Sequence, residues 1–540
     1  MYILGINGGL RQGYQDVSAV LVKDGGIIAA VEEERLSRVK SSAGRLPYLS
    51  VLEVLNIGGI TIEQVDELAF HGSTWNGFDD KLEKYFNRNF GYCPSVKKHH
   101  HHDCHAASAF YASPFQNALI ISIDGSGDGI SLQISVGKGS EISTIYQAER
   151  PNSLGIYYTM ITQYCGFIKD RDEYKLMGLS SYGNRNAFTF DWLIDFKDGE
   201  LILDQDYLVE ILPGQPAPHR DEMMYNTKFI EKFDQPGRIP KSPISEFYKD
   251  IAASAQYHFE NLLLKIAEYF VQQTGLRNVC LAGGSALNCV ANQQLMNADF
   301  VEGIYIQPAS SDAGISLGAA WLSALEHCQQ PKAPSDTYLG SLYSNQEIEK
   351  ILEACHLSYK KLDDPAMTAA DFIAQNKVIG WFQNAMEFGP RALGNRCILA
   401  NPCHREIQNI VNQKIKLREG FRPFCPSVLE EDTTLYFEGK QTVSPYMTIT
   451  YDANEFAQQN IPGVVHVDQT ARIQTVNATD NPLYYSLLRY LKQKIGHGVV
   501  LNTSFNLSHE PIVCSPRNAI ATFFSSGLDA LIIGAYLIEK

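Results

Sequence analysis

The chain repeats one pattern of predicted elements. Residues 2–7 are apolar enough for a buried strand that ends in a Gly-Gly turn, and a hairpin follows at residues 17–32. Residues 118–123 form a second apolar run, which leads into a Gly- and Asp-rich turn at residues 124–129. A second hairpin is predicted over residues 130–148. We therefore expect the same order of strand, turn and hairpin twice in one chain.

A duplication of this kind begins each half of the actin-like fold of sugar kinases and heat-shock ATPases, a duplicated ribonuclease-H-like (ASKHA) architecture. In that fold the two turns face each other across a cleft and hold phosphate and metal. Two unrelated β-meanders would give a similar pattern, although the matching order of elements favours duplication.

The length of 540 residues exceeds the size at which one hydrophobic core keeps growing, so more than one domain is expected. Residues 329–344 are rich in Pro and polar side chains and are predicted to link two domains. We expect these domains to cover residues 1–335 and residues 345–540. In the second, strands alternate with helices, and capping residues mark helix starts at Ser344 and Ser515. The fold class is therefore α/β.

Composition narrows the functional classes. The net charge of −15 argues against a nucleic-acid surface spread over the whole molecule. The eleven cysteines are scattered and form no CxxC pair, a pattern typical of reduced thiols. The start of the chain has no basic leader, and no apolar run approaches the ~18 residues of a membrane span. We expect a cytoplasmic protein without membrane or nucleic-acid partners.

A histidine cluster is the clearest candidate metal site. Five of the fourteen histidines lie within residues 99–105, directly ahead of good helix formers. On a helix, His101 and His105 lie four residues apart on one face, so both imidazoles could bind one metal ion. A solvated polar loop or the remnant of an affinity tag would also contain such a run, although this cluster is internal and interrupted.

Two further turns are candidates for ligand binding. A strand at residues 278–281 leads into a turn at Gly283 and Gly284 ahead of a helix, an arrangement that can place backbone N–H groups against phosphate or ribose. A Gly-Gly pair also makes an ordinary tight turn. Asp312 precedes an apolar helix predicted over residues 313–325, where an N-cap is the common role of aspartate.

A basic stretch within residues 388–426 stands out in this acidic chain. Arg391 and Arg396 lie five residues apart in a Gly-bounded turn, and Phe, Pro and Gly are interleaved with the charges that follow: Lys414, Lys416, Arg418 and Arg422. A solvated cationic face is the usual form of a charge run. The interleaving instead indicates partly buried guanidinium groups, which need anions and match phosphate well. Residues 502–506, which follow a predicted strand, could add hydroxyl and amide donors.

With these features assembled, the sequence resembles the carbamoyltransferases of the NodU/CmcH/TobZ family over nearly its whole length. The matching segments are Glu32–Arg38 (EEERLSR), His101–Phe110 (HHDCHAASAF), Asp124–Asp128 (DGSGD), Tyr174–Leu179 (YKLMGL), Ala282–Gly284 (AGG), Gly389–Arg396 (GPRALGNR), Lys416–Glu419 (KLRE), Phe421–Phe424 (FRPF) and Leu501–Asn506 (LNTSFN).

The resemblance implies an enzyme that works in two stages. A C-terminal domain similar to threonylcarbamoyl-AMP synthase (the YrdC type) would use carbamoyl phosphate and ATP, with Mg, to form carbamoyl-adenylate and release pyrophosphate. The N-terminal actin-like domain would then transfer the carbamoyl group to a hydroxyl of a small molecule, such as a sugar or a natural product.

The resemblance also assigns residues. The metal ligands fall on His101, His105, Asp124 and Asp312, with iron(II) or another divalent ion as the metal, while Asp16 and Lys40 line the transfer site. Carbamoyl-adenylate would bind in the N-terminal domain at Gly283, Gly284 and Asn288. ATP and carbamoyl phosphate would bind at Arg391, Arg396, Lys416, Arg418, Arg422, Asn502 and Ser504. A homodimer is also expected.

The chain departs from the family at two positions near the expected transfer site. Many relatives carry His where this chain has Gln15, and Gln cannot act as a general base; Ser41 also replaces a frequent His.

Two other functions would share parts of this pattern. The alternatives are a tRNA threonylcarbamoylation enzyme, which the acidic composition opposes, and an actin-like nucleotide-binding regulator without transfer activity. Acceptor choice is expected to lie in the loops at residues 152–172 and 214–237.

Overall fold

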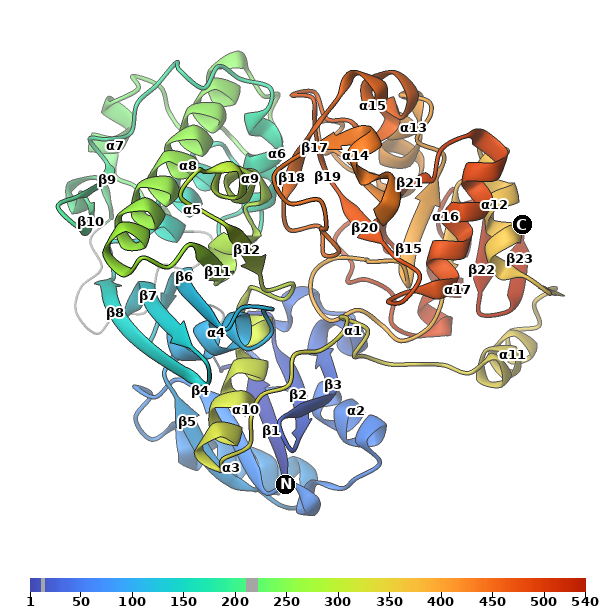
Figure 1. Cartoon of the computed structure of the whole chain (residues 1–540), viewed down its shortest axis with the longest axis horizontal. Helices are drawn as coiled ribbons and strands as arrows, with labels where there is room; N and C mark the ends of the chain where they lie inside the picture. The colour runs from blue at the N-terminus through green and yellow to red at the C-terminus, as the bar shows by residue number, and fades with distance from the viewer. Residues whose placement is uncertain (11–14, 210–221) are drawn as a thin grey trace.

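The computed structural model describes residues 1–10, 15–209 and 222–540 and has a mixed α/β fold. Figure 1 shows the N-terminal part of the chain, in blue to green, beside the C-terminal part, in orange to red. A yellow segment that follows helix α10 (Ile315–Glu326) crosses from one part to the other and leads to α11 (Asn345–Ala354). We refer to these parts as the N-terminal and C-terminal halves.

The first sheet of the N-terminal half has the strand order β3-β2-β1-β4-β5. Strand β1 is antiparallel to β2, which is antiparallel to β3, whereas β1, β4 and β5 run parallel. The strands are β1 (Tyr2–Asn7), β2 (Ser18–Lys23), β3 (Gly26–Glu32), β4 (Glu67–His71) and β5 (Ser95–His99).

The second sheet repeats this topology with the order β12-β11-β6-β7-β8. Taken in chain order, both sheets have two antiparallel pairs on one side of the first strand and two parallel pairs on the other. The predicted repetition of strand, turn and hairpin is therefore confirmed. The strands are β6 (Asn117–Gly127), β7 (Ile130–Lys138), β8 (Glu141–Glu149), β11 (Asn278–Ala282) and β12 (Gly303–Ile306).

Two helices fill the space between these sheets and position the candidate metal site. Helix α10 packs against β1 and β4, and α4 (His101–Phe110) packs against β6 and β11. The two helices approach closely at Gly318, where an added Cβ would lie 1.8 Å from the carbonyl oxygen of Cys104. Trp321 of α10 is fully buried in this layer.

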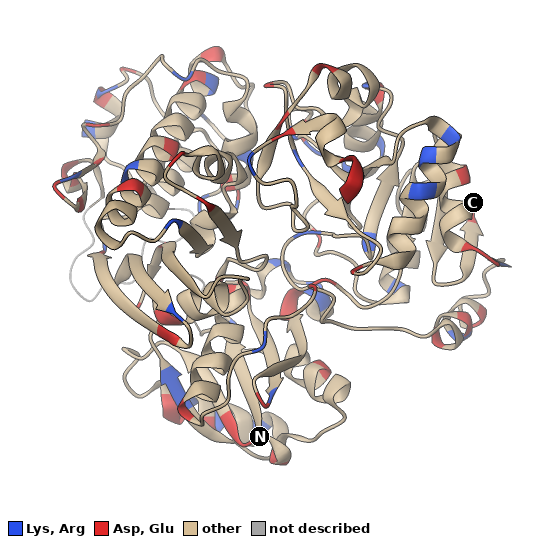
Figure 2. Ribbon diagram, viewed as in Figure 1, with Lys and Arg blue, Asp and Glu red and all other residues tan. Residues whose placement is uncertain are grey.

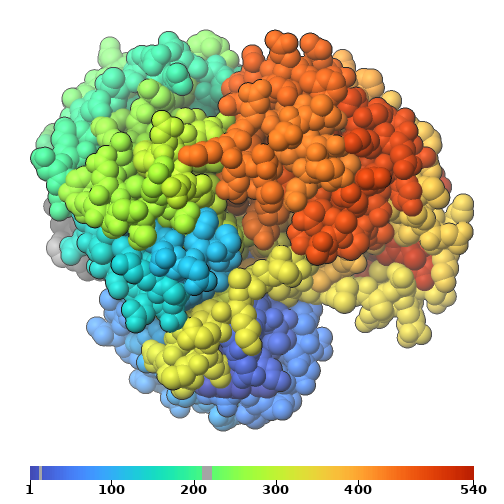
Figure 3. All heavy atoms as spheres, viewed as in Figure 1, coloured from blue at the N-terminus to red at the C-terminus, as the bar shows by residue number. Residues whose placement is uncertain are grey.

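Helices of the N-terminal half also reach the C-terminal half. Helices α5 (Leu154–Tyr164), α6 (Glu173–Ser180) and α8 (Glu246–Thr274) pack together, and α9 (Cys289–Asn297) packs against β18 (Thr450–Ala453). The Asn292 side chain donates to the carbonyl oxygen of Thr448 at 2.9 Å. Figure 3 shows green atoms of the first half against orange atoms of the second along this junction.

The C-terminal half is built on an eight-stranded mixed sheet with the order β13-β23-β22-β14-β15-β21-β16-β20. Its strands are β13 (Lys360–Lys361), β14 (Ile379–Phe382), β15 (Arg396–Ala400), β16 (Cys425–Leu429), β20 (Gln474–Val476), β21 (Val499–Ser504), β22 (Ala530–Ile533) and β23 (Tyr536–Glu539). Helices α12 (Pro365–Ala374) and α16 (Pro482–Ile495) pack on each other, and α17 (Pro516–Phe524) packs against β14 and β22. A three-stranded sheet adds β17 (Phe437–Glu438), β18 and β19 (Thr470–Arg472). The predicted helix caps at Ser344 and Ser515 are confirmed.

Charges of both signs are interspersed over both halves in the view of Figure 2. Among the described residues, no helix is long and apolar enough to cross a membrane.

Candidate active sites

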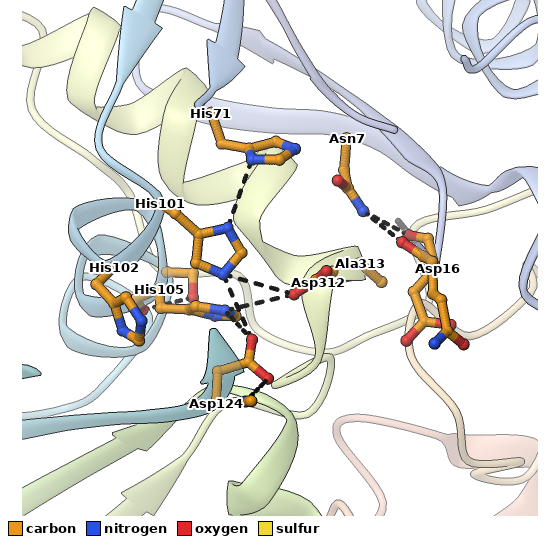
Figure 4. A network of polar contacts seen from close by, with 12 residues as sticks. Asn7, Asp16, His71, His101, His102, His105, Asp124, Asp312 and Ala313 are labelled. Carbon is orange, nitrogen blue, oxygen red and sulfur yellow. Dashed lines mark hydrogen bonds and ion pairs between the residues drawn. The ribbon is translucent and has the colours of Figure 1, made fainter. Parts of the chain in front are cut away.

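Four side chains from three segments converge in the N-terminal half. His101 and His105 lie one turn apart on α4, Asp124 lies on β6, and Asp312 begins the short 3-10 turn Asp312–Gly314 ahead of α10. Nε2 of His105 lies 3.3 Å from Oδ2 of Asp124 and 3.6 Å from Oδ1 of Asp312. For His101 the corresponding distances are 3.4 Å and 3.7 Å. Figure 4 shows all four side chains pointing at one another.

The structure does not show the alternative roles that the sequence allowed, a solvated loop for the histidine run and an N-cap for Asp312. His101 is 4% and His105 0% exposed, so the run is not a solvated loop. Asp312 makes no side-chain capping bond, and α10 begins only at Ile315. The alternative of an N-cap role for Asp312 is therefore not seen, and its carboxylate faces the histidines.

The neighbouring histidines have structural roles. His100 is the N-cap of α4 and accepts a hydrogen bond from the backbone N–H of His102. The rings of His102 and His99 contact the Ile130 carbonyl oxygen and the Ser323 hydroxyl. His71 on β4 lies behind the cluster, with its Nδ1 3.4 Å from Nδ1 of His101. His71 was missed from the sequence, where a single histidine at a strand end carries no signal.

The donor atoms fit a divalent metal ion. The two Nε2 atoms and two carboxylate oxygens all lie within 4.8 Å of one another. Burial opposes protonation of His105, but hydrogen bonds to Asp124 and Asp312 and their charges raise its pKa to about 9. Burial likewise opposes ionisation of Asp124, yet His101 and His105 hold its pKa well below the usual range. Two imidazoles facing two carboxylates are a ligand set that suits iron(II), zinc and related ions.

Figure 4 shows Asp16 on the side of Asp312 that faces away from the histidines. Asp16 has a positive φ of 52°, and its carbonyl oxygen accepts a hydrogen bond of 2.9 Å from the Asn7 side chain. Burial and the charge of Glu34 raise the pKa of Asp16 to about 6, against a hydrogen bond from Ser311. Lys40 pairs with Glu34 at 2.9 Å.

The Gly-Gly turn lies directly against the candidate metal-binding cluster of His101, His105, Asp124 and Asp312. A Cβ added to Gly284 would lie 3.2 Å from Oδ1 of Asp124, and one added to Gly283 would lie 2.0 Å from the carbonyl oxygen of Ile123. The side-chain amide of Asn288 is already hydrogen-bonded within the protein. Its Oδ1 caps α9 and its Nδ2 donates to Gln256 at 3.0 Å.

A second constellation, which we call the cationic cluster, lies where the two halves meet. It consists of Arg391, Lys416, Arg418, Arg422 and Arg472. Burial lowers the pKa of Arg391 to about 10 and that of Arg418 to about 9, and neighbouring arginines add to both effects. Burial and two arginine charges hold the pKa of Lys416 well below its usual range.

Glu419 is the carboxylate that lies near this cluster among the described residues, with its Oε2 3.8 Å from Nη1 of Arg422. Nε of Arg391 is buried and has no hydrogen-bond partner among the described residues. Arg418 is held by Asn412 at 2.6 Å and stacks on Phe424, while Arg422 stacks on Tyr174 of the N-terminal half. Lys416 is buried and the four arginines are partly buried, and cations crowded together with little solvent would stabilise a bound anion.

Two residues expected in this pocket lie elsewhere. The guanidinium of Arg396 is fully buried and donates to the carbonyl oxygens of Gln383, Ser341, Asn384 and Asn395. The Asn502 amide donates to Ala392 at 3.0 Å and to Ser427 at 3.0 Å. Ser504 does approach the cluster, with its hydroxyl 3.3 Å from Nζ of Lys416.

Two family models match most of the chain. The model described as "Carbamoyltransferase N-terminus" matches residues 89–321, and the model described as "Carbamoyltransferase C-terminus" matches residues 370–540. An "Uncharacterized protein sll1178" of Synechocystis sp. is 37% identical over 98% of this chain and 96% of its own length. The "Nodulation protein NolNO" of Sinorhizobium fredii is 34% identical over 100% of this chain and 83% of its own length.

The chain belongs to the carbamoyltransferase family. It is therefore a carbamoyltransferase, as the resemblance predicted. Among solved structures, HypF of T. kodakarensis matches this carbamoyltransferase over 60% of its length at 13% identity, with a TM-score of 0.36.

The carbamoyltransferase has one cationic residue in its cluster that the sequence did not reveal. Arg472 on β19 donates to the thiol of Cys425 from Nη2 at 3.0 Å and from Nε at 3.2 Å. Arg472 lies about fifty positions after the basic stretch in the sequence. The pairing of β18 with β19 brings it to the cationic cluster. The sequence feature that could have pointed to Arg472 is its place between two apolar residues at the end of a short strand.

Proposed function

We propose that this carbamoyltransferase divides an ATP-dependent reaction between its two sites. In this proposal residues 1–335 form an actin-like transfer domain and residues 345–540 form a YrdC-like domain that makes carbamoyl-adenylate. The observation that supports it is the presence in one chain of two separate constellations: the His101, His105, Asp124 and Asp312 cluster and the cationic cluster.

In the first stage, carbamoyl phosphate loses its phosphate to water, and the resulting carbamate oxygen attacks the α-phosphorus of MgATP. Carbamoyl-adenylate forms while phosphate and pyrophosphate leave, so the atoms balance. The side chains of Arg391, Arg418, Arg422 and Arg472 would bind the phosphate groups and stabilise the charge that develops on them. Arg396 and Asn502 would support the loops and strands around this site and would not bind its ligands.

In the second stage, a hydroxyl of the acceptor attacks the carbamoyl carbon, its proton passes to a base, and AMP leaves. A divalent ion, iron(II) in this proposal, would polarise the carbamoyl carbonyl when bound. Asp16 is the candidate base because Gln15 cannot accept the proton, and a carboxylate with a pKa of about 6 is ionised at neutral pH. The backbone at Gly283 and Gly284 would bind the adenylate next to Asp124.

The acceptor in this proposal is a small hydroxylated molecule, a sugar or a natural product. Residues 152–172 were predicted as a loop, but most of them form α5, so only the residues around this helix are loop. Of the second predicted acceptor loop, residues 214–221 lie outside the described residues.

A nucleotide-binding regulator without transfer activity would need neither the cluster of His101, His105, Asp124 and Asp312, which we call the four-ligand cluster, nor the crowded arginines.

Separate half-reactions test this proposal. Formation of carbamoyl-adenylate is followed by carbamoyl-phosphate-dependent exchange of labelled pyrophosphate into ATP, and transfer to water or acceptor by release of AMP. His101→Ala should lose metal and AMP release but keep the exchange, whereas Arg391→Met should lose the exchange but keep the metal. His100→Asn, which retains the helix cap, is the matched control. Equal damage to both half-reactions by either variant, in folded protein, would contradict the proposal.

A further inference from the structure

The segment from Glu32 to Arg38 matched the family but has no place in the chemistry above. It contains the short helix α1 (Glu33–Ser37), and four consecutive charged residues in it are at most 7% exposed: Glu32, Glu33, Glu34 and Arg35. Burying so many charges is costly unless each is paired. Their partners therefore indicate what the segment does.

Glu34 holds the turn that carries Lys40. One carboxylate oxygen accepts from Nζ of Lys40 at 2.9 Å, and the other accepts from the backbone N–H of Ser41 at 2.5 Å. The turn is strained, because Arg38, Ser41 and Ser42 all have positive φ angles, between 45° and 59°. Such backbone persists only where its surroundings fix it, and it is concentrated at functional sites.

Arg35 connects Glu34 to the C-terminal half. Its guanidinium pairs with both Glu32 and Glu34 and donates to the carbonyl oxygen of Gly389 at 2.8 Å. Gly389 lies two residues before Arg391 of the cationic cluster. It also lies against the N-terminal half, where its added Cβ would be 3.1 Å from the Pro308 carbonyl oxygen.

Arg38 makes a second connection. It donates to the carbonyl oxygens of Ile512 at 2.6 Å and Pro511 at 2.7 Å. The same loop is attached to the cationic cluster, because Asn506 donates to the Glu510 carbonyl oxygen at 2.7 Å and accepts from Lys416 at 2.8 Å. Both arginines of the segment therefore end on loops of the C-terminal half that carry or contact that cluster.

We propose that Glu34 is a positioning residue that holds Lys40 in the transfer site, and that Arg35 and Arg38 anchor it to the loops at Gly389 and at residues 511–512. This inference rests on the proposed place of Lys40 in the transfer site. It assigns the EEERLSR segment the task of fixing the transfer-site lysine relative to the site that makes the carbamoyl-adenylate.

Glu34→Gln tests the first part, because it keeps the shape of the side chain and removes its charge. We expect AMP release to fall about 100-fold, as for other small misplacements of a reacting group, with pyrophosphate exchange unchanged. The double variant Glu34→Gln/Lys40→Met should be no slower than Lys40→Met alone, since Glu34 acts through Lys40. The proposal would be overturned if the losses of AMP release in the two single variants multiplied in the double variant, or if Glu34→Gln kept full activity.

A second readout does not depend on activity. The Lys40 side chain is 49% exposed, so a small amine-acetylating reagent can reach it, and mass spectrometry can follow its labelling. Glu34→Gln should raise the labelling rate of Lys40 several-fold. Glu33→Gln is the matched control, because Glu33 instead accepts from Tyr48, Leu49 and Ser50 at the start of α2 (Leu49–Gly58). An unchanged labelling rate in Glu34→Gln would contradict the pairing even if the proposed chemistry were wrong.

Arg38→Gln tests the anchoring to the C-terminal half. The Arg38 guanidinium donates to the carbonyl oxygens of Arg35, Pro511 and Ile512, and its loss should raise Lys40 labelling and lower AMP release. If both remain at the parent level in folded Arg38→Gln, the anchoring role is wrong. If instead the parent protein shows no exchange that depends on carbamoyl phosphate, the proposed function fails while the labelling result stands.

Discussion

At the scale of single residues, two arginines of one motif have opposite roles. Nε of both arginines is buried without a hydrogen-bond partner among the described residues. The other guanidinium nitrogens of Arg396 donate to four backbone carbonyl oxygens, whereas Arg391 is surrounded by other cations. We infer that Arg391 is placed to receive an anion, whereas Arg396 holds a loop. The distinction is visible only in three dimensions, because both are arginines in the same Gly-bounded turn.

Substitution of these arginines by methionine should separate the two roles. Arg391→Met should abolish pyrophosphate exchange while the thermal unfolding midpoint stays within a few degrees of the parent. Arg396→Met should destabilise the fold by about 3 kcal/mol, because buried carbonyl groups lose their donors. Exchange assays and thermal unfolding measure both effects. Normal exchange in Arg391→Met would remove it from the ATP site.

Glu260 makes the stability of the N-terminal half depend on pH. Burial raises its pKa from 4.5 to about 7, against a hydrogen bond from Gln256. The folded state therefore binds this proton more tightly than the unfolded state, so stability falls as pH rises from about 4.5 to 7. Glu260→Gln should raise the free energy of unfolding by about 3 kcal/mol over the parent at about pH 8 and by little at about pH 5. Urea unfolding at both pH values measures this, and an equal gain at both would contradict it.

The site residues differ in how far sequence could predict them. The spacing of His101 and His105 required only helical geometry, so it could be read directly. Asp124 and Asp312 come from distant turns, and the family resemblance rather than any spacing pointed to them. Arg472 and His71 could not be found, because strand pairing alone brings them to their sites.

At the scale of elements, the duplicated sheets position the candidate metal ligands. Strand β6 ends next to α4, and this contact requires glycine at position 127, where an added Cβ would lie 2.1 Å from Cδ2 of His101. The duplication itself was predictable because strand, turn and hairpin are local in sequence. The order of the eight-stranded sheet was not, because its pairings join segments far apart in the chain.

Gly127→Ala should therefore displace His101 and weaken metal binding about tenfold or more, in a protein that remains folded. The matched control is Gly125→Ala in the same turn, where an added Cβ meets nothing within 4 Å. Metal content after dialysis against limiting iron(II) measures the difference. Equal metal content in both variants would show that His101 is not held by this contact or is not a ligand.

At the scale of the whole molecule, the two halves are joined by contacts on either side of the candidate sites. Asn292 and Gln293 of α9 bond to the segment around β18, and Arg35 and Arg38 bond to the loops at Gly389 and residues 511–512. Lys175 of α6 also pairs with Glu419 at 3.0 Å. The relative position of the cationic cluster and the four-ligand cluster is therefore fixed by several independent bonds.

The most direct test of a two-site carbamoyltransferase is to supply the intermediate to a variant that cannot make it. Arg391→Met is given freshly prepared carbamoyl-adenylate, and metal-dependent AMP release above the spontaneous rate is measured. We predict AMP release at the parent rate with carbamoyl-adenylate and none with ATP plus carbamoyl phosphate, while Arg391→Met/His101→Ala releases none with either. Failure of folded, metal-loaded Arg391→Met to use carbamoyl-adenylate would contradict the division of the reaction between two sites.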